Sequence, residues 1–555
     1  MSIFKLKQNP DELKSSNSGI TQYQTRQIAP TRDVTTTNFS NGTQYYKWNL
    51  AGNRWWLPSR SYFRIRAKLT KSDGVTPLTL SDNIAPNQNL ASHLFQSCEF
   101  RIGSTPVSRI DNRVPQVDAL KTRLNKSSAW LRTIGDSLNF TEDSFKLRQN
   151  AVCSDGSIIN EQTGSGKLST SKTDLGFGPN ATVELKNANS QIIIDNTIAS
   201  GGGNGATIGA SFRPGDVLEL AGVGGSGFFL VNSIALSGGD QIITLTVTET
   251  LVDSVAANRT FNRIRPFAID TENSRRVSSF ELIYTPALGI FDYEGALPCG
   301  DYELAMQPLS DSLLKQSVIE SIGANKQHGT DYKFEIQDCY FYISEIEGPR
   351  CDSLSYLLDL EQIRLTTNKI ASASFSQRQF DVSQSTRAIA CAFQDGRAGS
   401  GTDTRISASK FKSYVGNAVD PLDDSKDAGL FLNRMYYQYA GVNYPNTSDV
   451  DPNYDEKNFT DQTTQRYVDT MIQSGGAFDT GGSETLQEWQ SNGAYYYNKI
   501  YRDASDASTR LNLYTQFRNA IDPDNMRALV FDMHSSVARV TIHNGQVINV
   551  ELTEA

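Results

Sequence analysis

The sequence contains little cysteine, and none of it forms a metal-binding or disulfide motif. Six cysteines are scattered over 555 residues, and no two of them make a C-x-x-C pair. Small secreted domains held by disulfides carry a much denser cysteine framework. We therefore expect the cysteines to be small buried side chains, in a protein that folds in a reducing compartment. The six are Cys98, Cys153, Cys299, Cys339, Cys351 and Cys391.

Long apolar runs are also missing. No uncharged apolar stretch reaches the ~18 residues that a membrane-spanning helix needs. Residues 1–19 lack the apolar core of roughly 7–15 residues that a secretory leader contains. The sequence therefore predicts no transmembrane segment and synthesis inside a cell.

The chain has no excess of basic residues. It carries 52 Lys and Arg against 61 Asp and Glu, which gives a formal net charge of −9. Proteins that bind nucleic acid by neutralising phosphates are usually basic. We therefore expect no direct, sequence-specific contact with DNA or RNA.

Alternating apolar and polar residues dominate what is present. In residues 61–70, Phe63, Ile65 and Leu69 share one face while the arginines between them share the other. Similar runs recur to the end of the chain, with turns predicted at Gly103-Ser104, Ala440-Gly441 and Asn544-Gly545 and a bulge near Gln337-Asp338. Helices are few: we predict them at 111–124, at 127–131, at 352–360 and at 460–476. The last of these would have an apolar stripe made of Tyr467, Val468, Met471 and Ile472. This pattern favours an all-β protein with antiparallel sandwiches.

The composition divides the chain into five segments. Residues 1–45 are polar and read as an N-terminal arm, in which Ile3, Phe4 and Leu6 could anchor. Glycine-rich turns between β-branched runs mark 182–265 as an inserted β domain. The flanks 46–181 and 266–348 then form one sandwich, and 349–555 forms the other.

Two glycine-rich motifs resemble phosphate-binding loops, but the residues around them do not fit that function. Gly222, Gly224 and Gly227 match G-x-G-x-x-G, but the β-branched and aromatic run after them does not begin a helix. Residues 164–167 read GSGK, but Glu161 replaces the first glycine of a P-loop and Leu168 its Ser or Thr. We interpret both as turns.

Other patterns of chemistry are incomplete. Asp449, Asp451 and Asn453 have calcium-loop spacing, but Tyr454 replaces the glycine and Thr460 the final glutamate. The four histidines form no H-E-x-x-H motif, and no G-x-S-x-G motif exists. We therefore predict no enzyme activity, no cofactor, no metal, and no catalytic residue.

The order of the segments resembles that of the double jelly-roll major capsid proteins of virophages, Polinton-like viruses and related eukaryotic DNA viruses. The similar stretches are 89–124, with strand, turn, strand and helix; 280–308, where LPCG precedes a strand; 332–349; 378–393; and 429–456, with a glycine–proline hairpin. Each motif is loose, and their order over residues 50–555 carries the resemblance.

The resemblance implies that each sandwich is a jelly roll, and that the chain is a capsid protein of a virion. It further implies homotrimers that form pseudo-hexagonal capsomers of an icosahedral shell. Partners would be neighbouring capsomers, and penton and minor capsid proteins. We expect the N-terminal arm to contact a neighbouring subunit rather than the genome, because Lys5 and Lys7 are offset by Asp11 and Glu12.

Two other classes stay open. Clusters of tyrosine at 436–444 and 495–501 suggest a contact surface, which a β-rich viral fibre or a carbohydrate-binding adhesin would also have. A fibre should show short repeats, and the sequence has none. A polysaccharide-degrading enzyme would need a pair of carboxylates in a cleft.

Overall fold

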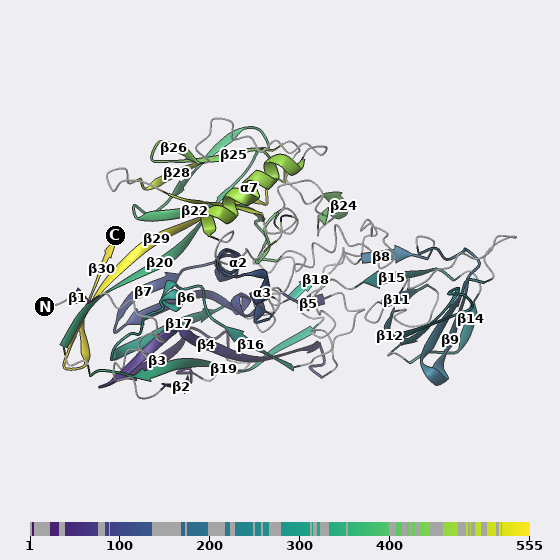
Figure 1. Cartoon of the computed structure of the whole chain (residues 1–555), viewed down its shortest axis with the longest axis horizontal. Helices are drawn as coiled ribbons and strands as arrows, with labels where there is room; N and C mark the ends of the chain where they lie inside the picture. The colour runs from purple at the N-terminus through teal and green to yellow at the C-terminus, as the bar shows by residue number, and fades with distance from the viewer. Residues whose placement is uncertain are drawn as a thin grey trace.

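The computed structural model places two β-sandwiches side by side and a smaller β unit at the end away from the termini (Figure 1). It describes residues 3–4, 23–32, 39–75, 84–87, 89–131, 133–135, 168–172, 175–197, 212, 217–221, 228–247, 250–256, 259–265, 279–310, 314, 319–321, 332–350, 353–398, 407–412, 419–420, 423–427, 432–444, 459–475, 484, 486, 489, 494–500, 508–517, 521–522 and 524–554.

The first sandwich is a jelly roll of eight strands. In chain order they are β2 (Tyr23–Ile28), β3 (Gln44–Leu50), β4 (Arg54–Lys71), β6 (Phe95–Ile102), β7 (Thr105–Ile110), β16 (Ser279–Tyr284), β17 (Gly300–Pro308) and β19 (Tyr332–Glu347). One sheet has the order β16-β4-β19-β2 and the other β3-β17-β6-β7. Counted along the chain, the sheets are therefore 6-3-8-1 and 2-7-4-5. Two Greek keys wound together give this arrangement, which defines a jelly roll.

The second sandwich repeats this topology. Its eight strands are β20 (Ser353–Lys369), β21 (Ser376–Asp381), β22 (Thr386–Asp395), β25 (Leu432–Tyr439), β26 (Val442–Tyr444), β27 (Tyr495–Lys499), β28 (Arg510–Phe517) and β29 (Met526–His543). The sheets have the orders β20-β29-β22-β27 and β21-β28-β25-β26. Counted along the chain these are 1-8-3-6 and 2-7-4-5, the same two sheets as in the first sandwich. The predicted all-β class with two jelly rolls in one chain is confirmed.

Aromatic side chains fill the space between the sheets of the first jelly roll. Trp48 on β3 meets Trp56 on β4 with ring centroids 4.8 Å apart, and Phe341 on β19 with centroids 5.3 Å apart. Alternation places these rings inward and polar neighbours outward, as the run 61–70 predicts. The predicted bulge lies in β19, where its register against β4 shifts between Ile336 and Asp338.

The inserted unit is one antiparallel sheet around its own apolar core. Its strands are β8 (Leu168–Ser171), β9 (Thr182–Lys186), β10 (Gln191–Asp195), β11 (Val217–Leu220), β12 (Phe228–Ser237), β13 (Ile242–Val247), β14 (Ser254–Ala256) and β15 (Phe261–Arg265), with the 3-10 turn η4 (Asn187–Asn189). The core includes Phe177, Phe212 and Phe261. The first and last strands pair, with Leu168 opposite Arg265, so the unit leaves the jelly roll where it enters.

Small elements complete the described chain. Helices α2 (Val114–Asn125), α3 (Ser128–Leu131) and α7 (Phe459–Ser474) lie in the connections between the fifth and sixth strands of the rolls. The 3-10 turns η2 (Leu90–Leu94) and η5 (Gly289–Asp292) belong to the first roll. Three short pairings join β5 (Ile84–Pro86) to β18 (Ile319–Ser321), β23 (Val419–Asp420) to β24 (Asp423–Asp427), and β30 (Gln546–Glu554) to β29.

Most predicted turns and helices are confirmed. Gly103, Ala440 and Asn544 all have positive φ at the tips of hairpins, where two-residue turns require it. Helices α2, α3 and α7 lie at three of the four predicted places. On α7, however, Met471 is buried while Val468 and Ile472 are exposed, so the predicted apolar stripe is divided between two faces.

The predicted helix at 352–360 is wrong. Residues 353–369 form strand β20, which pairs with β29 over its whole length. The spacing of Leu354, Leu357 and Leu358 imitates a helical stripe. The face that is buried is instead Tyr356, Leu358 and Leu360, which alternate as in a strand, because tertiary pairing overrides local propensity.

The boundaries of the arm and of the insert also need correction. Residues 23–28, inside the predicted arm 1–45, form β2 and pair with β19. Near the N-terminus, Ile3 and Phe4 form β1 and pair in parallel with Ser355 and Tyr356. The inserted unit begins at Leu168 rather than at residue 182, because the short polar strand β8 carries no apolar signal.

Candidate interaction surfaces

The two jelly rolls meet through a buried contact made by helix α2. Its Arg123 donates from Nε to Oε1 of Glu484 at 2.7 Å and from Nη1 to the carbonyl of Ser409 at 2.9 Å. The guanidinium also lies 5.2 Å from the centre of the Phe411 ring. Tyr467 of α7 donates to the carbonyl of Glu484 at 2.7 Å, which ties the helix of the second roll into the same contact. Buried charge is acceptable here because the arginine and the carboxylate are paired and hydrogen-bonded to each other.

Amides and hydroxyls extend this contact along α2 and η2. Gln116 donates to Oε1 of Gln394 at 3.1 Å, and Gln394 donates to the carbonyls of Ala408 and Lys410 at 3.0 and 2.8 Å. His93 Nε2 lies 2.7 Å from the Ser409 hydroxyl. Specific polar partners at a buried surface fix how the two rolls pack.

Close backbone approach fixes a second point of contact. Gly289 in η5 of the first roll lies against β20 of the second, and a Cβ built on it would lie 1.9 Å from the carbonyl oxygen of Glu361. The edge strand β7 also reaches β20, since Gln362 donates to the carbonyl of Val107 at 2.6 Å. One apolar core cluster runs through both rolls. The two rolls therefore form one packed body.

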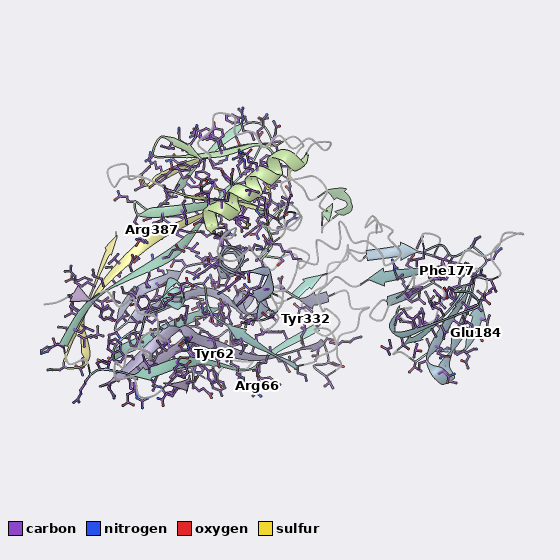
Figure 2. All side chains as sticks on the ribbon, viewed as in Figure 1. Tyr62, Arg66, Phe177, Glu184, Tyr332 and Arg387 are labelled. Carbon is purple, nitrogen blue, oxygen red and sulfur yellow. The ribbon has the colours of Figure 1, made fainter. Side chains whose placement is uncertain are left out.

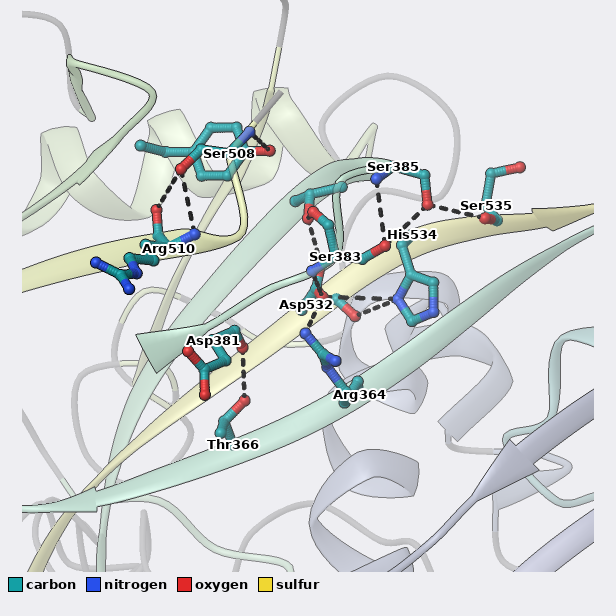
Figure 3. A network of polar contacts seen from close by, with 12 residues as sticks. Arg364, Thr366, Asp381, Ser383, Ser385, Ser508, Arg510, Asp532, His534 and Ser535 are labelled. Carbon is teal, nitrogen blue, oxygen red and sulfur yellow. Dashed lines mark hydrogen bonds and ion pairs between the residues drawn. The ribbon is translucent and has the colours of Figure 1, made fainter. Parts of the chain in front are cut away.

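A buried carboxylate organises one end of the second roll (Figure 3). Asp532 on β29 is fully buried and accepts hydrogen bonds from the Ser383 amide at 2.6 Å and the Thr386 hydroxyl at 2.7 Å. Arg364 on β20 donates to it at 3.3 Å, and His534 Nδ1 lies 3.7 Å from it. The carboxylate thus joins β20, β29 and the turn before β22.

The serines, histidine and aspartate in Figure 3 are the residue types of a catalytic triad, but their geometry differs from one. A triad needs a nucleophile on the histidine nitrogen that faces away from the acid. Ser535 donates instead to Asp359, and the hydroxyls of Ser383 and Ser385 bond to each other at 2.9 Å. In the described part of the chain no hydroxyl lies within hydrogen-bond distance of His534 Nε2. We interpret the network as structural.

A cavity of about 240 Å³ lies beside α2 in the first roll. Asp118 is buried in its wall, accepts a hydrogen bond from Asn89 at 3.3 Å and lies next to the Tyr284 hydroxyl. Burial raises the pKa of Asp118 to about 7, and the hydrogen bond from Asn89 and the charge of Lys121 partly oppose this rise. A carboxyl group that titrates near neutrality is therefore present inside the first roll.

The outer face of the β16-β4-β19-β2 sheet is charged. Arg64 pairs with Glu281 at 2.7 Å, and Arg66 pairs with Asp338. Tyr62 stacks on Tyr342 with ring centroids 5.5 Å apart. Figure 2 shows Tyr62 and Arg66 on the side of the first roll that faces away from the second.

The outer face of the β21-β28-β25-β26 sheet has a different composition. Phe375, Tyr514 and Tyr436 form a row in which successive ring centroids lie 5.9 and 4.6 Å apart. Arg434 lies over Phe375, and the neighbouring outward positions on β21, β28 and β25 carry the amides Gln377, Gln379, Asn512, Gln516 and Gln438. Aromatic and arginine side chains with few other charges are typical of protein–protein interfaces.

The predicted tyrosine surface is thus much smaller than the sequence suggests. Tyr437, Tyr439, Tyr495 and Tyr496 are buried, and burial raises the pKa of Tyr437 and Tyr495 well above the usual value. Because side chains alternate along a strand, Tyr436 is the tyrosine of the RMYYQY run that lies on the outer face. Spacing alone could not separate inward from outward tyrosines.

The motifs examined in the sequence lie largely outside the described residues. These are 222–227, 164–167 and 449–454. The strands on either side of 222–227, β11 and β12, pair with each other, which agrees with a turn there. Cys98, Cys299, Cys339 and Cys391 are buried thiols outside any disulfide, as expected, whereas Cys153 and Cys351 are not described. In the described segments we find no cluster of metal ligands and no helix both long and apolar enough to cross a membrane.

Comparisons with known proteins give structural likeness alone. No protein family and no curated protein matches the sequence. The Sputnik virophage structure determined by cryo-EM matches with 9% identity and a TM-score of 0.46, covering 100% of this chain and 93% of that one. The PBCV-1 virus capsid matches with 10% identity and a TM-score of 0.40, covering 97% of each chain. The mavirus major capsid protein matches with 8% identity and a TM-score of 0.37, covering 100% and 96%.

The fold itself follows from the strand orders of the two rolls.

Proposed function

We propose that this chain is a major capsid protein, and that three copies form a pseudo-hexagonal capsomer of an icosahedral virion shell. The observation that carries the proposal is the duplication: two complete jelly rolls of the same strand order, packed into one body. Six rolls from three such chains make a six-sided tile, and tiles of this shape can close a shell.

The positions of the connections indicate how the chain would be oriented in such a shell. The long connections between fifth and sixth strands carry α2, α7 and the inserted unit, and they lie at one end of the rolls (Figure 1). Both termini and the hairpin of β29 and β30 lie at the other end. In the proposed shell, the end with the termini is the base, where neighbouring capsomers, penton proteins and minor capsid proteins would contact the chain.

A carbohydrate-binding adhesin is the less favoured function. Sugar rings stack on exposed aromatic faces, but in the row Phe375–Tyr514–Tyr436 the rings cover one another's faces. The buried, polar contact between the two rolls also has no role in a simple stalk. Catalysis is not part of the proposal, because the polar network around Asp532 lacks a positioned nucleophile among the described residues.

Light scattering of the purified full chain tests the proposal. We expect a mass three times the 61.2 kDa of one chain at micromolar concentration, and electron microscopy should show six-sided particles or shells. A stable monomer that never assembles at any salt concentration contradicts the capsid function. Extended stalks would support the fibre alternative instead.

A further inference from the structure

Helix α7 carries two apolar side chains that its own chain leaves partly exposed. Val468 and Ile472, one turn apart, are 41% and 43% exposed, and Gln465 extends the same face. The opposite side of the helix is anchored, since Arg466 and Met471 are buried. The helix is therefore held firmly while it presents two branched apolar side chains outward.

Helix α2 lies in the corresponding connection of the first roll, and the second roll covers its outward face. Both helices lie between the fifth and sixth strands of a jelly roll. Gln116 and Arg123 of α2, seven residues apart, bond to Gln394 and Ser409 of the second roll. On α7 the exposed face spans the same seven residues, from Gln465 to Ile472. One helix is thus covered by the next roll of the chain, whereas the other meets solvent.

The neighbouring edge strands show the same difference. In the first roll, the fifth strand β7 contacts the first strand of the next roll through Val107 and Gln362. In the second roll, the fifth strand β26 has Val442 exposed at 42%. The helix and the edge strand that one roll uses to bind its neighbour therefore both carry exposed apolar side chains in the other roll.

We propose that the exposed face of α7, with Val442 of β26, binds the first jelly roll of a second copy of this chain. The contact would repeat between chains the arrangement that α2 and β7 make within the chain. Strand β2, which has in the first roll the place of β20 in the second, would then receive the edge strand β26, as β20 receives β7. A contact between unlike faces closes into a ring when the rotation allows, and six rolls close after three chains. The inference rests on the proposed trimer and names the surface that forms it.

Paired substitutions in the full chain test this inference. Val468→Asp with Ile472→Asp places two carboxylates on each proposed interface, where they would lose water without gaining a partner. We expect loss of the trimer and a single-chain mass in light scattering at micromolar concentration. The matched control is Val252→Asp with Val255→Asp on the inserted unit, where the valines are 73% and 69% exposed. This control should remain trimeric, and circular dichroism should show that both variants are folded.

A second measurement does not require that a substitution disrupt the interface. In an Ile472→Cys variant the new thiol should react slowly with a maleimide in the trimer and at least tenfold faster after dilution to single chains. A Val255→Cys thiol should react equally fast in both states. A trimeric Asp variant, or an Ile472→Cys thiol that reacts equally fast in both states, overturns the inference and leaves the capsid function intact. If the unmodified chain itself never forms trimers, the proposed function fails and this inference fails with it.

Discussion

Gly289 of the first jelly roll and Glu361 of the second approach each other so closely that no side chain fits between them. A Cβ on Gly289 would lie 1.9 Å from the carbonyl oxygen of Glu361, well inside van der Waals contact. The atom in the way belongs to the backbone of a long paired strand, which cannot move without breaking the ladder between β20 and β29. The junction of the two rolls therefore depends on this glycine.

Gly289→Ala should destabilise the protein by about 3 kcal/mol or more, because relief of the clash must shift one roll against the other. Denaturant unfolding of the purified variant measures this loss. Gly52→Ala is the control: a Cβ there meets no atom within 4 Å, and only the positive φ of 70° opposes it. A cost of about 1 kcal/mol is expected for the control. Equal effects of the two substitutions would show that the close approach is not maintained.

The pair of Arg123 and Glu484 should contribute more to stability than exposed ion pairs do. Arg123→Met leaves a carboxylate that is largely buried without its partner, and we expect a loss of about 3–5 kcal/mol. Replacing both residues, as Arg123→Met with Glu484→Gln, should recover part of this loss. The control is Arg539→Met, whose pair with Glu551 is about half exposed on both sides and should contribute at most about 1 kcal/mol. A double-mutant cycle that gives no coupling between Arg123 and Glu484 contradicts the assignment.

The raised pKa of Asp118 predicts a stability that falls as pH rises. Its pKa is about 7 in the folded protein against a usual value of 3.8, so the folded state binds the extra proton between these two values. Stability from this group is therefore fully present below about pH 4, is lost as pH rises through about 7, and is constant above that. The groups around the carboxyl include Asn89, Lys121, Tyr284, the backbone of Ala287 and the thiol of Cys98.

Asp118→Asn should remove this dependence, because the amide keeps the size of the side chain and cannot ionise. We expect the variant to gain stability relative to the unmodified chain between pH 5 and pH 8, by up to about 4 kcal/mol. Denaturant unfolding at a series of pH values gives the difference. A difference that is constant across this range would place the pKa of Asp118 near its ordinary value.

Sequence patterns predicted those parts of the fold that depend on local geometry. Alternation located β4, and Asn544-Gly545 located the hairpin of β29 and β30, because each signal is confined to a few neighbouring residues. The strand β2 was missed because Tyr23–Ile28 is mostly polar and is stabilised by pairing with β19. The strand β20 was mistaken for a helix because three leucines happened to have helical spacing.

The interaction surfaces could not be predicted in the same way. Arg123 and Glu484 are 361 residues apart in the sequence, and neither has a neighbour that marks it as half of a buried pair. The exposed face of α7 was also hidden, since Val468 and Ile472 read as core residues until the helix was placed on its roll. Buried pairs and exposed faces of this kind depend on which face of each element the folded chain covers. The sequence alone does not specify which face is covered.

The inserted unit should be removable without loss of the jelly rolls. Its first and last strands pair from Leu168 opposite Arg265, so the chain leaves and returns at nearly the same point. The unit has a separate apolar core, so its deletion opens no cavity in the core shared by the two rolls. Connections between elements of a jelly roll tolerate large changes in length, since each doubling of a loop costs only about 0.6 kcal/mol.

Replacing residues 168–265 by a short Gly-Ser linker should therefore give a soluble chain with the same oligomeric mass as the full protein. Residues 168–265 expressed alone should fold, with an unfolding transition of their own. Light scattering and thermal unfolding of the two pieces are the measurements. Insolubility of the shortened chain, with a folded insert, would mean that the rolls need the insert for their own stability. If instead the insert alone stays unfolded, its separate core is insufficient and it depends on the first roll.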